Sequence, residues 1–159
     1  MLFRSRVWYE DIDFSFKLFI KAKKMCFLEE NLYNYLLRDG SIMNSKNLSR
    51  NLELLDAFDE IIKYAKKYNT YEKYYNEVEF LAINHIYISC IVRILTNANA
   101  TKQEKKQLLR KMLEYINRNF SEYSKNIYLK YLPKNRRTVY YLVRLKLYGI
   151  IKLIFKIKK

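Results

Sequence analysis

The chain has 159 residues, half of them apolar, so it is long enough to bury a sizeable core. Its two glycines and single proline disfavour a turn-rich all-β fold and favour long helices. It contains no stretch of about 18 uncharged apolar residues, and its first residues lack the apolar segment of a secretory signal. We therefore expect a cytoplasmic protein without a membrane span.

The net charge of +15 is unevenly distributed along the chain. Residues 121–159 contain 11 basic side chains and one acidic side chain, a net charge of +10, whereas residues 1–70 contain 12 basic and 10 acidic side chains, a net charge of +2. A charge concentrated in one terminal segment predicts a local electrostatic partner.

Residues 11–24 are predicted to form a helix that follows an acidic pair. Ile12, Phe16 and Ile20 share one face at helical spacing. Glu10 and Asp11 stand at the N-terminus, where the helix dipole and free backbone N–H groups favour negative charge. From the residues alone, two interpretations stay open: the pair caps the helix, or it forms a site at the lip of a cleft.

Two short strands are predicted next, at residues 25–28 and 31–37. Glu29-Glu30 separates them, and Asp39-Gly40 ends the second. A strand pair this small is not stable in isolation, so it requires a neighbouring sheet.

The order of these pieces resembles the acceptor-side end of the catalytic domain in family 2 glycosyltransferases, the inverting GT-A enzymes of bacterial surface-polysaccharide (capsule) synthesis. The matching segments are Tyr9-Glu10-Asp11, Met25 to Leu28, and Leu32-Tyr33-Asn34-Tyr35-Leu36-Leu37-Arg38-Asp39-Gly40-Ser41, within residues 7–50. Together with the composition, which favours long helices, the sequence predicts a mainly α fold. Residues 1–45 would be a remnant of the GT-A α/β domain, with one helix and two short strands, and a helical tail would follow.

The resemblance also implies roles for individual residues. Asp11 would be the general base that removes the acceptor hydroxyl proton, and Glu10 would orient the acceptor. Trp8, Tyr9, Arg38 and Ser41 would bind substrate, the last two near the departing nucleoside diphosphate. The alternative for Arg38 and Ser41 is a solvated arginine beside Asp39 and a serine that caps the next helix.

The donor half of such an enzyme is missing from this sequence. The aspartate motif that holds Mg²⁺ or Mn²⁺ in the family is absent, so we expect no metal or cofactor in this chain and no activity from it alone. A nucleotide-sugar and a glycan acceptor would bind only once an N-terminal glycosyltransferase half is present. The single histidine, His85, sits on an apolar helix face and is interpreted as a core or interface residue.

Helical patterns fill residues 46–135, which we treat as a second region. We predict helices over about 46–68 and 71–97, a third after the capping box Thr101-Lys102-Gln103-Glu104, and a short one over 121–131 that stops before Pro133.

The third region, residues 136–159, is predicted to be a basic amphipathic helix over about 136–157. It fits the headgroup layer of an anionic membrane at the inner face of the cell, and no motif indicates nucleic-acid binding. The alternative is a core helix with a solvated basic face. The rival function to the transferase is a non-enzymatic basic module that binds a membrane surface or a partner protein. The basic side chains expected at the membrane are Arg136, Arg137, Arg144, Lys146, Lys152 and Lys156.

Overall fold

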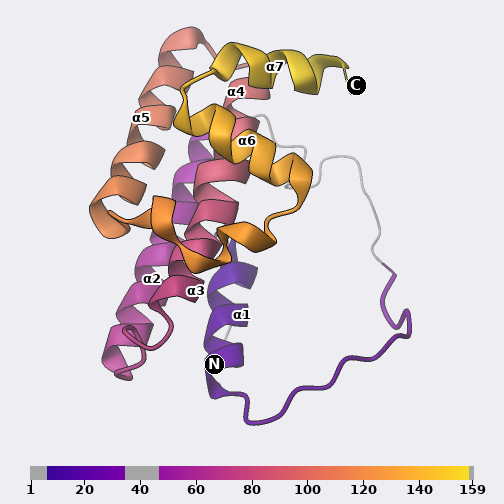
Figure 1. Cartoon of the computed structure of the whole chain (residues 1–159), viewed down its shortest axis with the longest axis vertical. Coiled ribbons are helices and arrows are strands. Elements are labelled where there is room, and N and C mark those ends of the chain that lie inside the picture. Colours follow the sequence, from indigo (N-terminus) through magenta and orange to yellow (C-terminus); the bar gives the residue numbers. More distant parts are fainter. Residues whose placement is uncertain (1–6, 35–46, 158–159) are drawn as a thin grey trace.

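The computed structural model describes residues 7–34 and 47–157, and Figure 1 shows them as a bundle of helices with a long extended segment after the first helix. The elements in chain order are α1 Glu10–Lys21, the 3-10 helix η2 Leu48–Leu52, α2 Glu53–Lys67, α3 Tyr75–Ala82, the π-helix η3 Ile83–Cys90, α4 Ile91–Thr96, α5 Lys102–Asn119, the 3-10 helices η4 Tyr123–Lys125 and η5 Ile127–Tyr131, α6 Lys134–Arg144 and α7 Tyr148–Ile157.

One long helix organises the bundle. Elements α3, η3 and α4 run on without interruption over Tyr75–Thr96, and we call them together the central helix. Elements α2, α5, α6 and α7 all contact it, while α1 packs mainly on α2. Figure 1 shows α6 and α7 lying across the upper half of the bundle. The central helix is long and apolar enough to cross a membrane, but 61% of its most apolar stretch is buried inside the fold, and a core helix passes the same test.

The core is a single cluster to which all three predicted regions contribute. Phe16 comes from the first region, Ile86 from the second and Ile151 from the third. The largest fully buried side chains are Tyr87, Tyr140, Phe58, Phe120, Leu54, Ile61, Ile83, Ile86, Ile91, Ile94, Met112 and Ile116. This continuous apolar interior holds α1 and the tail helices against the bundle.

The predicted helices in residues 46–119 are confirmed. The capping box forms at α5: the Glu104 backbone N–H donates to Thr101 Oγ1 at 3.2 Å, and the Thr101 backbone N–H donates to Glu104 Oε2 at 2.7 Å. Helix α2 ends where Asn69 adopts a left-handed conformation (φ 54°), which lets the Thr70 N–H bond to the carbonyl of Ala65.

The prediction of one helix over 136–157 is wrong, because the chain forms two. Helix α6 ends in a Schellman motif at Lys146 (φ 57°), in which the Leu147 N–H donates to the carbonyl of Leu142 and the Lys146 N–H to that of Val143. The break lets α6 pack on η3 and α7 pack on α4.

The short helix expected at 121–131 is divided into η4 and η5. Asn126 lies between them, and its buried side-chain amide donates to Glu79 Oε2 at 2.7 Å. Drawing this amide into the core interrupts the helix. The expected stop before Pro133 is confirmed, because η5 ends at Tyr131 and Pro133 caps α6.

The two predicted strands are wrong over the residues that can be checked. Residues 25–28 and 31–34 form no strand, and their apolar side chains are exposed, Phe27 to 89% and Tyr33 to 80%. The described part of the chain offers no sheet with which they could pair. Residues 35–37, Arg38 and Ser41 lie outside the described residues. The mainly α class is therefore confirmed, and no strand of a GT-A domain accompanies it in the described ranges.

Candidate functional site

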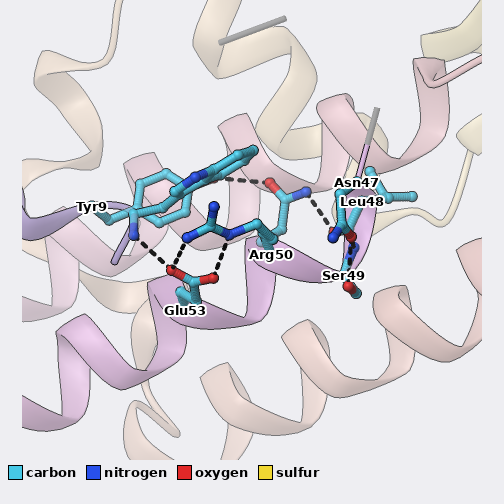
Figure 2. Close-up of polar contacts among 8 residues, drawn as sticks. Tyr9, Asn47, Leu48, Ser49, Arg50 and Glu53 are labelled. Atoms are coloured by element: carbon cyan, nitrogen blue, oxygen red, sulfur yellow. Dashed lines mark hydrogen bonds and ion pairs between the residues drawn. The ribbon is translucent and has the colours of Figure 1, made fainter. Parts of the chain in front are cut away.

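Trp8 is buried at the start of α1, where it holds the chain against α2. Its side chain is only 6% exposed, and its backbone N–H donates to Glu53 Oε2 at 2.6 Å. The Arg50 guanidinium lies over the indole ring, 4.7 Å from its centroid, and donates through Nε to Glu53 Oε1 at 2.7 Å. Figure 2 shows Arg50 and Glu53 facing each other beneath the aromatic rings. The ion pair and the stacked ring stabilise each other.

Tyr9 adopts a left-handed backbone conformation, with φ 64°, just before the first turn of α1. Such a conformation is strained for a bulky residue and persists only when its surroundings hold it. Here the Tyr9 hydroxyl donates to Asn51 Oδ1 at 2.9 Å, and Arg93 of α4 donates to the Tyr9 oxygen and to Asn51 Oδ1, the latter at 3.0 Å. Burial raises the pKa of Tyr9 to about 12 against the opposing charge of Arg93, so the phenol stays protonated at neutral pH.

These residues form what we call the anchor, made of Trp8, Tyr9, Arg50, Asn51, Glu53 and Arg93. It ties the start of α1 to η2, α2 and α4. The role of Asn51 and Arg93 could not be predicted from the sequence, because neither residue is near Trp8 and Tyr9 in the chain. The substrate-binding role of Trp8 and Tyr9 stays a prediction, and both side chains already have contacts within the fold.

Unlike Trp8 and Tyr9, Asp11 lies at the surface. Its exposed carboxylate lines a groove of about 670 Å³ between α1 and the α3–η3 part of the central helix. Ser15, Glu77 and His85 add polar groups to this lining, whereas Glu10 is half-buried and not part of it. The other lining residues are mostly apolar: Ile12, Phe16, Phe19, Ile20, Ala22, Met25, Tyr74 and Leu81.

His85 lies in the wall of this groove, within the π-helical turns of η3. π-Helical turns recur at functional sites because they displace side chains from the regular helical register. Burial lowers the pKa of His85, the positive charge of Arg136 lowers it further, and Asp11 opposes both. The imidazole is therefore neutral at neutral pH and can accept a proton or a hydrogen bond.

The groove combines an exposed carboxylate, a neutral imidazole and a hydroxyl group with an apolar floor. Such a set can accept a proton from a ligand hydroxyl and bury an apolar part of the same ligand. Within residues 7–34 and 47–157, no group of three or more His, Cys, Asp or Glu side chains could hold a metal ion. Sequence reasoning missed the proximity of Asp11 and His85 because it results from the packing of α1 on the bundle.

The basic tail residues divide into two groups. Arg137 is half-buried and donates to the carbonyl oxygens of Lys130 and Leu132, the latter at 3.2 Å. Its hydrogen bonds therefore stabilise the fold. The other five predicted membrane-surface cations are exposed: Arg136, Arg144, Lys146, Lys152 and Lys156.

Helix α7 and the turn before it have an exposed apolar face. It consists of Leu147, Ile150, Leu153 and Ile157, and Ile157 is 76% exposed. The opposite face holds buried Ile151 against α4. Helix α7 is therefore apolar both toward the core and toward solvent.

No family model, curated protein or solved structure matches this chain. The resemblance to family 2 glycosyltransferases therefore depends on the order of residues 7–50 alone.

Proposed function

We propose that this chain is the acceptor-side part of a family 2-type sugar transferase at the inner face of the cell membrane, inactive without a donor-binding half. The observation that carries the proposal is the position of Asp11. Its carboxylate is exposed and lines the same groove as the neutral imidazole of His85. Asp11 is also the residue to which the resemblance assigns the role of base.

The proposed chemistry is an inverting transfer. The acceptor hydroxyl oxygen attacks the anomeric carbon of the donor sugar, the bond to the nucleoside diphosphate breaks, and Asp11 takes the hydroxyl proton. Glu10 orients the acceptor, and Arg38 and Ser41 contact the leaving diphosphate. Mg²⁺ or Mn²⁺ would be held by the partner half, because this sequence lacks the family's metal motif.

Reconstitution tests this proposal. The chain alone should transfer no sugar, and activity should require co-expression with an N-terminal half that carries the metal motif. In that complex, Asp11→Asn should lower turnover by roughly 10²–10⁴-fold, and Glu10→Gln should have a milder effect. Asp56→Asn, on the exposed side of α2, is the matched control and should leave turnover unchanged. Sugar transfer by the isolated chain, or near-normal turnover of Asp11→Asn, would contradict the proposal.

A second candidate is a non-enzymatic basic module that binds an anionic membrane surface, and the outer face of α7 favours it. The exposed apolar side chains there lie beside Lys152 and Lys156, within a segment that carries a net charge of +10 over residues 121–159. An interfacial helix buries such a face at the acyl boundary, and each nearby cation contributes about 1 kcal/mol on an anionic surface. Both candidates place α7 at the membrane.

Vesicle co-sedimentation tests the membrane contact. The chain should bind phosphatidylglycerol vesicles and release them between about 0.1 and 1 M salt, as the Debye length falls from about 10 to about 3 Å. Leu153→Asp should weaken binding, while Leu18→Asp, at an exposed apolar position on α1, should not. Equal binding to neutral phosphatidylcholine vesicles, or binding unaffected by Leu153→Asp, would contradict this contact.

A further inference from the structure

A second groove, of about 520 Å³, lies between α6, α7 and the central helix, on the tail side of the bundle. One part of its lining is polar, with Ser89, Asn135, Arg136 and Thr138. The rest is apolar and includes Ile88 and Phe155. Among the described residues that line it, Arg136 is the only charged side chain.

Arg136 has only weak, neutral partners in this groove. Its Nη1 donates to Asn84 Oδ1 at 3.2 Å and to Ser89 Oγ at 3.3 Å. Both distances are at the long end for hydrogen bonds, and among the described residues Arg136 makes no ion pair. The Ser89 hydroxyl donates its own proton to the carbonyl of Asn84 at 2.8 Å, which directs its oxygen toward the guanidinium. The fold therefore orients a guanidinium beside two side-chain oxygens without neutralising its charge.

We propose that this groove binds one anionic phospholipid, with its phosphate on Arg136 and its acyl chain along the apolar wall. A guanidinium matches phosphate oxygens through paired hydrogen bonds, and the Asn135 side-chain amide lines the same groove as a further donor. The Thr138 hydroxyl donates its proton to the carbonyl of Lys134 at 3.0 Å, so only its oxygen faces a ligand as an acceptor. A free phosphate ion would use only the polar end, whereas an acyl chain also covers Ile88, Val92 and Phe155.

The position of the groove on α7 gives the second argument for a lipid. Ile154 and Phe155 of α7 line the groove, while Ile150 and Leu153 of the same helix face solvent. If the solvent-exposed face of α7 binds a membrane, lipid molecules therefore lie next to the groove. This inference depends on the membrane contact proposed above and assigns it a specific lipid headgroup chemistry.

Monomeric short-chain lipid tests the site without a membrane. The full chain should bind dihexanoyl phosphatidylglycerol below its micelle concentration, measured by calorimetry, and should bind inorganic phosphate more weakly. Arg136→Gln should lower the affinity for this lipid about tenfold, since a charge-assisted hydrogen bond is lost. Lys134→Gln, an exposed cation in the same first turn outside the groove lining, is the matched control and should change it little.

The outcomes separate this site from the membrane contact itself. The lipid site would be overturned by equal affinity for phosphate and lipid. It would also be overturned if Arg136→Gln kept full lipid affinity and an unchanged thermal unfolding midpoint. Neither result would contradict vesicle binding through α7. If the chain bound the short-chain lipid through Arg136 but did not sediment with vesicles, the result would support the site and contradict the membrane contact. Arg136→Lys, which keeps the charge and loses the paired donors, should fall between the native chain and Arg136→Gln.

Discussion

Neighbouring residues at the start of α1 have opposite environments. Trp8 and Tyr9 turn inward and form the anchor with η2, α2 and α4, whereas Asp11 is exposed at the groove. The left-handed Tyr9 marks the point at which the chain changes direction. Adjacent residues of one short motif can therefore have different roles. The buried aromatic residues fix where the helix begins, and the position of the helix in turn exposes the carboxylate to a ligand.

Trp8→Ala should have the largest effect on stability. It removes a buried indole and the ring on which Arg50 stacks, so we expect a loss of about 3 kcal/mol in the free energy of unfolding. Urea unfolding followed by circular dichroism measures it. Tyr33→Ala, at an aromatic residue in the exposed segment, is the control and should lie within about 0.5 kcal/mol of the native chain. Equal effects from the two substitutions would show that the anchor does not hold α1.

Asn51→Ala should come next, at about 2 kcal/mol. Its side-chain oxygen accepts hydrogen bonds from Tyr9 and Arg93, and its amide donates to the carbonyl of Leu48 at 2.7 Å. Removing it leaves two part-buried donors without this acceptor and the Leu48 carbonyl without this donor. The same urea titration applies, with Asn31→Ala in the exposed segment as control. A change below about 0.5 kcal/mol would mean that water replaces the amide without loss.

His85 should make stability depend on pH. Its pKa is lowered in the folded chain below the ordinary value of 6.5, so the unfolded chain binds this proton more readily. The contribution of neutral His85 is therefore complete above about pH 6.5 and is lost as pH falls toward the folded-state pKa. Urea midpoints at pH 7.5 and 5.5 should differ more for the native chain than for His85→Gln. An identical difference in both chains would contradict this account.

Asp11→Asn should change stability least, within about 0.5 kcal/mol, because the carboxylate is exposed and Glu10 and Asp13 remain in the first turn of α1. Its effect should be seen on His85 instead. Because the negative charge of Asp11 raises the pKa of His85, the substitution should lower that pKa further, as measured by NMR titration. Asp56→Asn is the control. An unchanged His85 titration in Asp11→Asn would show that the Asp11 carboxylate and the His85 imidazole do not interact.

Much of the helical fold could be predicted from the sequence because its causes are local. Apolar residues at helical spacing predicted α1, α2 and the central helix, and the Thr101–Glu104 capping box predicted the start of α5. The stop before Pro133 follows from the same short-range sterics. The sequence also determined the basic tail, since a net charge of +10 over residues 121–159 does not depend on the fold.

Tertiary structure decided the rest, because these features depend on partners distant in the chain. Residues 25–28 and 31–34 have strand-like side chains, yet they form no strand, because the described part of the chain offers no sheet beside them. The tail pattern fits one helix, but packing on two parts of the central helix divides it at Lys146. The proximity of Asp11 to His85, and the contact of Arg93 with Tyr9, exist only because helices far apart in the sequence bury their apolar faces against each other.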